Sequence, residues 1–380
     1  HGGDLTHRMA QAGGRYHENK RDYLNASLTL SGVIFEDWTW DANFTTGKTE
    51  SELLVGNALR NDRINDSFQL IGPCQETSSC PDFTPFARPS TEVLDYILDE
   101  HTTTTDVVNH AFSANLVGDL LELPAGTVQM SAGLEVRYES LEYKPSELWE
   151  SGSLSSMMTG MDASRNIQEV YTEVLIPVLA DVTAAKALDF EFAIRKAEYS
   201  TEDSSFTSSK FGVNWSINDD IRFRSTFSKA VRAPQLNELF AGESIGYVTM
   251  SDPCHKDNIY GGPADGRRLE NCGKLGIAPG WVSNVSTQRG QVTSSGFEEL
   301  KEEKAETFTA GFVLQPSDIS GLRISLDYFD IKLEDMISQF GANAMLSNCV
   351  DLRPSSIDND FCKQVTRADD GDVLNVRSSS

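Results

Sequence analysis

The chain repeats a pattern in which apolar and polar residues alternate over segments of about ten residues. In the clearest segment, 128–138, apolar side chains occupy every second position. A period of two is typical of a β-strand, because successive side chains point to opposite faces. The connections between these segments are alternately very short and very long. Long strands with asymmetric connections predict a transmembrane β-barrel with an apolar outer face and a polar lumen.

Eleven segments carry this pattern. They span 22–31, 37–49, 107–121, 127–142, 167–179, 187–199, 208–217, 220–231, 303–315, 321–337 and a partial segment that begins at 372. The soluble alternative is a β-sandwich, whose strands usually contain ~5–6 residues, whereas strands that cross a membrane need ~9–11. Because the complete segments are at least ten residues long, we predict an all-β, antiparallel, up-and-down transmembrane barrel.

The alternation also assigns each side chain to a face. Leu134, Phe192 and Leu326 belong to the apolar set, which we expect to face lipid. The charged side chains expected to face the lumen are Asp189, Glu191, Arg195, Arg222, Arg224, Arg323 and Asp327. For Arg222, Arg224 and Arg323, contact with an anionic ligand or the plug is one interpretation. Salt bridges with Asp189, Glu191 or Asp327 on neighbouring strands are the alternative.

The long connections lie at 50–106, 143–166, 200–207, 232–302 and 338–371. Short connections, rich in turn residues, separate them. Antiparallel strands in a membrane produce this order when tight turns lie on one side and long loops on the other. By this rule, the long loops are extracellular and the short turns periplasmic.

Composition excludes several classes of function. The formal net charge of −25 argues against nucleic acid as a partner, because a phosphate backbone is bound through Lys and Arg. No apolar run reaches the ~18 residues of a transmembrane helix. The six histidines form no HExxH motif, and the chain has no phosphate-binding glycine loop. We therefore expect no enzyme activity, no cofactor and no metal site.

The six cysteines are close together in pairs and lie outside the expected strands. The pairs are Cys74 and Cys80, Cys254 and Cys272, and Cys349 and Cys362. An even number of cysteines in loops predicts local disulfides and an oxidising compartment. The alternative, a zinc site, needs closely spaced cysteines with clustered histidines, and only His255 adjoins a cysteine.

The segment at 221–240 reads IRFRSTFSKAVRAPQLNELF and resembles the signature of TonB-dependent outer-membrane receptors. In that family, an outgoing strand ends in RAP and is followed by a short spacer and ELF. The matching residues are Arg232, Ala233, Pro234, Glu238, Leu239 and Phe240. Pro234 has no backbone N–H to donate to a ladder, so it marks the place where strand pairing stops.

A second stretch resembles the two strands that follow the RAP loop in this family. Residues 302–316 match the entry strand and 322–337 the exit strand, whose DYF triplet is Asp327, Tyr328 and Phe329. The cysteine-bearing loops resemble one large subgroup, as do LVGDLLELPAGTVQMSAGLEVRYE and EVYTEVLIPVLAD. The resemblance covers residues from about 20 to 380.

This resemblance implies an outer-membrane receptor of a Gram-negative bacterium that imports a siderophore or iron complex, cobalamin or an oligosaccharide. The implied partners are the small nutrient ligand, outer-membrane lipid, and the TonB–ExbB–ExbD complex acting through a plug domain. Barrels of this kind have about 22 strands. We therefore expect 1–380 to be an internal fragment of one barrel, without the plug and the final strands. The alternatives are a passive channel or adhesin of the same architecture, and a soluble β-rich secreted domain.

Candidate ligand-binding residues lie in the long loops and in the lumen. The aromatic candidates for ligand stacking are Trp149, Tyr247, Tyr260 and Trp281. The cationic candidates are Arg222 and Arg224. For the aromatic side chains, the alternative is that the loops pack against themselves.

Overall fold

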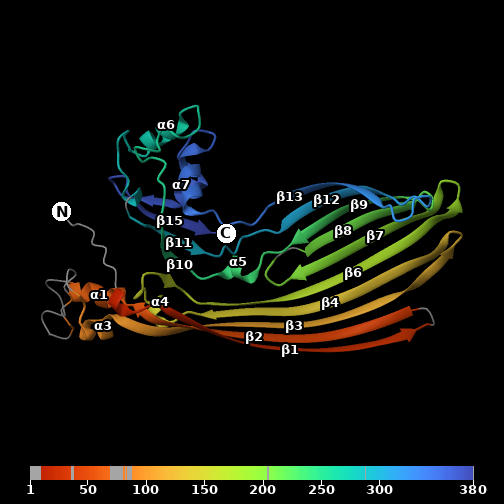
Figure 1. Cartoon of the computed structure of the whole chain (residues 1–380), viewed down its shortest axis with the longest axis horizontal. Coiled ribbons are helices and arrows are strands. Elements are labelled where there is room, and N and C mark those ends of the chain that lie inside the picture. The colour runs from red at the N-terminus through yellow and green to blue at the C-terminus, as the bar shows by residue number, and fades with distance from the viewer. Residues whose placement is uncertain are drawn as a thin grey trace.

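The computed structural model describes residues 10–35, 38–68, 80, 81, 83, 88–202, 205–286 and 288–379. Within this part of the chain, a ten-stranded sheet and a five-stranded sheet form the framework. The ten-stranded sheet is a long curved trough, and the smaller sheet stands at one end of it (Figure 1). No helix of the described residues has the length and apolar character needed to cross a membrane.

The large sheet, which we call the main sheet, is antiparallel, and its strands follow their order in the chain. Its strands are β1 (Tyr16–Ile34), β2 (Trp38–Leu59), β3 (Leu98–Leu123), β4 (Gly126–Lys144), β6 (Met161–Val182), β7 (Ala185–Tyr199), β8 (Ser205–Ser216), β9 (Ile221–Arg232), β12 (Glu303–Leu314) and β13 (Ile324–Glu334). This is the up-and-down arrangement of long strands, short turns and long loops predicted from the sequence. The predicted fold class is therefore confirmed.

The register between strands places the expected apolar side chains on one face. Leu28 lies opposite Phe44, which lies opposite Phe112 on the third strand. Phe192 and Phe211 form a similar pair on β7 and β8. These side chains are exposed although they are large and apolar. These exposed side chains form a band across one face of the main sheet, which we call the apolar band.

Four strands, β1, β2, β3 and β6, are much longer than the sequence predicted. β2 continues to Leu59 and β3 starts at Leu98, so residues assigned to the loop 50–106 extend the sheet beyond the apolar band. Val55 and Ala58 are buried on this extension, and they pack against Leu154 and Trp149 from the next loop. Acidic residues such as Glu50 and Asp106 interrupt the apolar alternation, so the pattern did not predict a strand here. The two strands nevertheless remain paired through this region.

Two short helices close the loop between these extensions, α1 (Asn61–Phe68) and α3 (Thr91–Ile97). Val93 and Ile97 of α3 are buried with Phe83 in a small core. Arg60, just before α1, donates from Nε to Asp62 at 2.9 Å and from Nη1 to Asp99 at 3.1 Å. The root of this loop is therefore held by charged hydrogen bonds above the apolar band.

Acid should weaken this loop root. The hydrogen bonds from Arg60 hold the pKa of Asp62 at about 2, below its usual range. A lowered pKa in the folded state stabilises it above about pH 4, and this contribution disappears as the pH falls towards 2. We expect the difference in amide protection of α1 between the wild type and Asp62→Asn to shrink from pH 4 to pH 2. The control is Asp66→Asn, because no ion pair of Asp66 is found within the described ranges. A difference that stays constant with pH would contradict the assignment.

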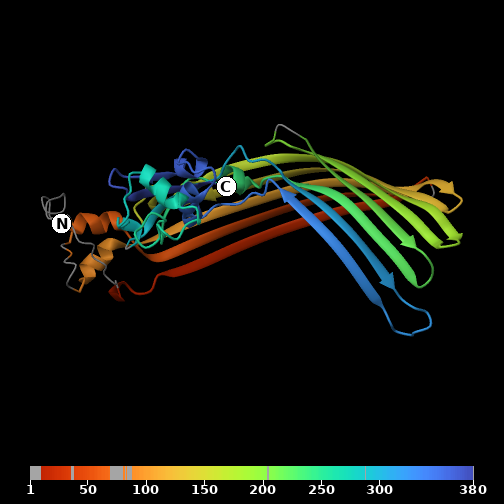
Figure 2. The ribbon, with the colours of Figure 1, turned by 90° about the horizontal axis from the view of Figure 1, so that it is seen from above.

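The smaller sheet belongs to a unit that we call the loop module, residues 244–295 and 342–379, which joins two long loops. Its strand order is β14 (Val365–Arg367), β15 (Val373–Ser379), β11 (Gly290–Ser295), β10 (Ser244–Val248) and β5 (Met157–Met158), the last coming from the β4–β6 loop. This five-stranded sheet, which we call the loop sheet, lies between the helices of the loop module and the outer ends of β2–β4 (Figure 1). Figure 2 shows from above that the loop module overlaps the main sheet at this end.

One expectation about this region was wrong. The strand predicted from 372 exists as β15, but it pairs with β11 in parallel and with β14. The described main sheet thus has ten strands rather than eleven.

The helices of the loop module build two small cores. Met345 and Leu346 of α7 (Ala342–Asp351) pack against Val376 of the loop sheet. The other core contains Cys254, and Cys272 of α6 (Arg267–Lys274). The remaining helical segments are η1 (Ala10–Ala12), α4 (Glu147–Glu150), α5 (Leu236–Phe240), η2 (Asn284–Ser286) and α8 (Asp360–Lys363).

Two of the expected disulfides are present in the loop module. Cys254 is bonded to Cys272, and Cys349 to Cys362. Cys74 lies outside the described residues, and Cys80 is disulfide-bonded. The bonds close loops of 18 and 13 residues in a unit with small cores, where restricting the unfolded chain helps most.

Candidate functional site

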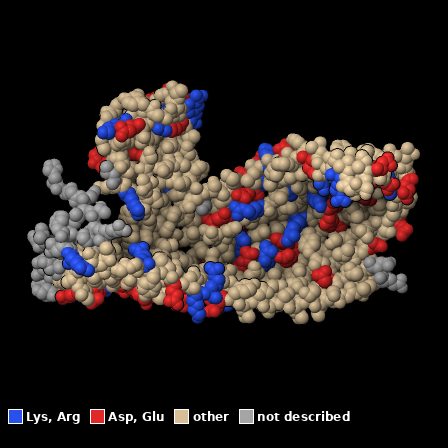
Figure 3. All heavy atoms as spheres, viewed as in Figure 1, with Lys and Arg blue, Asp and Glu red and all other residues tan. Residues whose placement is uncertain are grey.

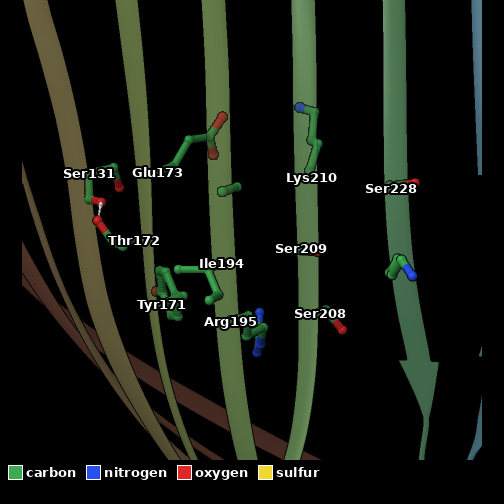
Figure 4. A pocket seen from close by; sticks show the side chains of 12 residues that line it. Ser131, Tyr171, Thr172, Glu173, Ile194, Arg195, Ser208, Ser209, Lys210 and Ser228 are labelled. Carbon is green, nitrogen blue, oxygen red and sulfur yellow. Dashed lines mark hydrogen bonds between the residues drawn. The ribbon is translucent and has the colours of Figure 1, made fainter.

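The concave face of the main sheet carries the polar side chains. In one row across the strands, Ser131 lies opposite Glu173, and Lys210 lies opposite Ser228. The neighbouring row contains Tyr171 and Arg195. A hollow of about 350 Å³ is lined by these residues, where small side chains leave space between the charged ones. Figure 4 shows how they are spread over β4 to β9.

A glycine allows the polar rows to pack closely. A Cβ atom at Gly133 would lie only 2.5 Å from the ring of Tyr171. Tyr171 crosses this space and donates from its hydroxyl to Asn115, which in turn donates to Asp41 at 2.8 Å. The hydrogen-bonded chain therefore extends from β6 to β2 across the lumen face.

The charged side chains of this face form a connected network of ion pairs. Arg137 contacts Glu135 and donates to Glu139 at 2.8 Å. Arg165 donates to the other oxygen of Glu139 at 2.8 Å. Two further pairs are Arg195 with Glu169 and Lys210 with Glu191. Figure 3 shows this mixture of charges across the middle of the concave surface.

The network continues into the RAP segment. Arg165 also donates from Nη1 to the carbonyl oxygen of Pro234 at 2.7 Å. Pro234 follows the end of β9 and is among the most buried residues. The polar chain on the lumen face is thus joined directly to the point where the long loop leaves the barrel.

The RAP–ELF residues form a clamp at the root of this loop. Arg232 donates to both carboxylate oxygens of Glu238, at 3.0 Å and 3.2 Å. The same carboxylate accepts the backbone N–H of Gln235 at 2.7 Å, which completes the capping box of α5. Leu239 is buried on the other side of this short helix. The RAP–ELF motif therefore has a local structural role: Glu238 caps α5 and pairs with Arg232, and Leu239 anchors the helix by burial.

Glu303 joins the roots of both loops that build the loop module. Its Oε2 accepts from Arg232 at 2.6 Å, at the start of the first loop. Its Oε1 accepts the backbone N–H of Ile337 at 2.8 Å, at the start of the second. One carboxylate at the first position of β12 thus positions both loops relative to the sheet.

Glu238→Ala should loosen this clamp. It removes two hydrogen bonds from a guanidinium and one helix cap, and hydrogen bonds to charged groups contribute about 1.5–3 kcal/mol. We expect α5 and Phe297, whose N–H donates to the Glu238 carbonyl, to lose amide protection by about that free energy. Asn237→Ala is the control, because Asn237 is exposed on the same helix. Equal protection in both variants would show that the clamp contributes nothing.

The structure separates the candidate ligand-binding residues. Trp149 packs against His101, with ring centroids 5.1 Å apart. Trp281 donates from its indole N–H to the carbonyl of Asp370 at 3.0 Å and packs into the second core of the loop module. Both contacts are the self-packing given as the alternative. Tyr247 and Tyr260 are exposed, on β10 and in the loop before α6.

The two arginine candidates also differ. Arg224 donates to Asp327 at 2.9 Å, so it forms the lumen salt bridge given as the alternative. Arg222 lies near the short turn at Asp219 and Asp220, and neither it nor Arg323 forms an ion pair within the described ranges. The structure brings none of these arginines together with the four aromatic candidates.

The DYF residues lie on β13, next to β12. Asp327 reaches over Gly311, where a Cβ atom would lie 2.1 Å from its carboxylate oxygen. Tyr328 is exposed on the apolar face and contacts Phe308. Phe329 points to the opposite face, because neighbouring residues of a strand alternate. The triplet thus contributes one lumen salt bridge and one residue of the apolar band.

Sequence reasoning did not single out Arg165 or Glu169, and it named Glu303 only as a residue that matches the entry-strand motif of the family. A signal was present for part of the network, because Glu135, Arg137 and Glu139 alternate with apolar residues along one strand. Charges at every second position indicate a shared face. Which charges meet across strands depends on register, and for Glu303 on the distant residue Ile337.

These features define a protein of the antiparallel, up-and-down β-barrel class, with one apolar and one polar face on its main sheet and a disulfide-bonded loop module at one end. The sequence matches the family described as TonB dependent receptor-like, beta-barrel, over residues 2–373. The chain therefore belongs to the TonB-dependent receptor family.

The chain was compared with solved structures, among them two siderophore receptors and a peptide transporter. The siderophore receptor PirA from Acinetobacter baumannii has 15% identity and a TM-score of 0.48, over 95% of this chain and 40% of that one. PirA from Pseudomonas aeruginosa has 11% identity and a TM-score of 0.41, over 94% and 51%. The RagAB peptide transporter has 11% identity and a TM-score of 0.50, over 86% and 31%.

At these identities the likeness concerns the fold alone. The chain spans less than two thirds of each of these relatives. No curated protein matches the sequence.

Proposed function

We propose that this protein is an outer-membrane receptor of a Gram-negative bacterium that imports a scarce small nutrient with energy supplied through TonB. The observation that carries the proposal is family membership over residues 2–373. Two features of the structure support it: a polar lumen face along the main sheet, and a loop module positioned over one end of that face (Figure 1).

In the proposed mechanism, the receptor binds and gates without breaking a bond. The loop module and the outer part of the lumen contact the ligand. The TonB–ExbB–ExbD complex acts on a plug domain and opens the path, using the proton gradient of the inner membrane. Lipid covers the apolar band. The proposed ligand is a siderophore or iron complex, cobalamin or an oligosaccharide.

The test is growth on limiting nutrients. We expect a strain that lacks the receptor to lose growth on one nutrient of a panel containing a ferric tricatecholate, cobalamin and oligosaccharides. A strain that lacks TonB should lose growth on the same nutrient. A plasmid copy of the receptor should restore growth only in cells that contain TonB.

Two results would contradict the proposal. Uptake that requires the receptor but continues without TonB would indicate a passive channel. Normal growth of the receptor-deficient strain on the whole panel would remove the basis for an import function.

A further inference from the structure

The face of the main sheet that carries the apolar band, which we call the outer face, changes from apolar to polar over β4 to β8. Three neighbouring rows of paired residues show the change. The first row is Leu134, Val170, Lys196 and Thr207, the second is Val136, Gln168, Glu198 and Ser205, and the third begins with Tyr138 and Asn166. Within these rows, apolar side chains give way to polar ones towards the long loops.

Two adjoining hollows lie along these rows. The first has a volume of about 350 Å³, and Leu134 and Val170 line its apolar side. The second has a volume of about 460 Å³ and is lined by polar side chains that include Asn166. Gln168 and Glu198 line both hollows. The two hollows therefore form one groove, which we call the outer groove, with an apolar and a polar part.

The apolar part of the outer groove is open to its surroundings. Leu134 is 42% exposed, Val136 46% and Val170 57%. Apolar side chains in contact with water are unfavourable, and an exposed apolar patch marks a place where another apolar group binds. This part of the groove is continuous with the apolar band, so the same surroundings cover both. That continuity favours a lipid chain over a soluble partner.

The polar part of the outer groove carries groups that match hydroxyls. In the described part of the chain, the side-chain amides of Asn166 and Gln168 form no hydrogen bond, and both residues are exposed. The Nζ atom of Lys196 lies 3.3 Å from Oε1 of Glu198, and these side chains are 51% and 63% exposed. An exposed ion pair is weak, so its groups can exchange partners. Amides donate and accept hydrogen bonds and carboxylates accept them, so together they can hold neighbouring hydroxyls.

The charge of the outer groove argues against a headgroup held by its phosphate alone. Lys196 is the one cation among the described residues that line the groove, and the carboxylates of Glu198 and Glu202 also line it. An anionic headgroup without further contacts would meet as much repulsion as attraction there. A headgroup rich in hydroxyls needs no surplus of positive charge.

We propose that the outer groove binds one glycolipid of the outer leaflet. An acyl chain of this acylated sugar lies on Leu134 and Val170, and its hydroxyls contact Asn166, Gln168 and Glu198. The polar part of the groove lies towards the long loops, which are on the extracellular side in the predicted topology. This proposal rests on the outer-membrane location given with the proposed function. It does not depend on which nutrient is imported, because the groove faces away from the lumen.

The test is native mass spectrometry of the receptor extracted from outer membranes in mild detergent, with two purified lipids as probes. One probe is lipopolysaccharide with a short sugar chain, which is an acylated sugar. The other is phosphatidic acid, which has acyl chains and a phosphate but no sugar. We expect the wild type to bind one molecule of lipopolysaccharide at least about tenfold more tightly than phosphatidic acid, because only the sugar can bond to both amides.

The double variant Asn166→Ala and Gln168→Ala removes both amides of the groove and leaves the net charge unchanged. We expect its affinity for lipopolysaccharide to fall at least about fivefold. The matched control is Lys229→Ala with Glu306→Ala. It removes an ion pair of 2.6 Å on the outer face of β9 and β12, outside the groove, and also keeps the net charge. We expect this control to bind as the wild type does. Heat-dependent migration on gels verifies that each protein is folded.

Each outcome decides the proposal. A loss of lipopolysaccharide binding confined to the groove variant supports it. Equal binding by the groove variant and the control would overturn it, as would equal affinity of the wild type for the two lipids. A receptor dimer that disappears in the groove variant would also overturn it, because a second copy would then occupy the groove. The TonB-dependent growth test judges the import function separately, since none of the substituted residues faces the lumen.

Discussion

Arg367→Met should unfold the loop module locally and cost about 3–5 kcal/mol, because it leaves a buried carboxylate without its cation. Arg367 donates from Nη1 and Nη2 to the two carboxylate oxygens of Asp252, at 2.7 Å and 3.0 Å. The Asp252 side chain is 0% exposed and that of Arg367 is 10% exposed. Water therefore cannot replace the lost partner.

The loss of stability should extend through the loop module because Asp252 makes further hydrogen bonds there. Its oxygens also accept from the backbone N–H of Cys254 at 2.9 Å and the hydroxyl of Ser283 at 3.0 Å. Asp252 lies in the first loop and Arg367, on β14, lies in the second, so the pair joins both loops of the module. Losing it should raise hydrogen exchange in the module while the main sheet keeps its protection.

Two controls make the measurement specific. Arg377→Met removes an ion pair whose arginine is 54% exposed, and exposed pairs contribute about 0.2–1 kcal/mol. The double variant Asp252→Asn and Arg367→Met removes the unpaired charge and should recover part of the lost stability. If Arg367→Met and Arg377→Met have equal effects, the buried pair is not what joins the loops.

Leu326→Arg should destabilise the receptor folded in lipid by about 2–4 kcal/mol, if this position faces the middle of the bilayer. Leu326 is 73% exposed on β13, so the substitution removes little protein packing. The penalty comes almost entirely from placing a guanidinium in hydrocarbon. Leu134 and Phe192, which are 42% and 45% exposed, should behave in the same way.

The matched control is Ser325→Arg, on the same strand but on the opposite, lumen face. Folding is measured by urea titration of the receptor in lipid vesicles. We expect the lumen variant to fold as the wild type does. Equal stability of Leu326→Arg and Ser325→Arg would refute the lipid-facing assignment of the apolar band.

Much of the fold could be predicted because alternation is a local property. A strand with one apolar face shows its direction and its two faces within ten residues, and Leu134 and Phe192 could be placed without knowing their neighbours. The same holds for Cys254 with Cys272 and for Cys349 with Cys362, because each pair is close in the chain. The RAP segment could be recognised for the same reason.

The candidate site could be predicted only in part. The alternation predicted a lumen face for Arg195, Glu191 and Arg224. Asp327 was one of three carboxylates considered as a partner of Arg224, but the partner of Arg195 was not predicted. Arg195 contacts Glu169 on the preceding strand, and Arg224 meets Asp327, which is 103 residues away in sequence. Trp149 and Trp281 were equally compatible with ligand stacking and with self-packing, because exposure depends on the folded loops.

By itself, the sequence determined that this chain forms long antiparallel strands with an apolar and a polar face, separated by tight turns and long loops. Only the tertiary structure decided that β15 joins the loop sheet, that β2 and β3 extend past the apolar band, and that Glu303 holds two loop roots. The physical reason is that a period of two is set within one strand. The partner of a strand or of a charge is set by register and by contacts between distant segments.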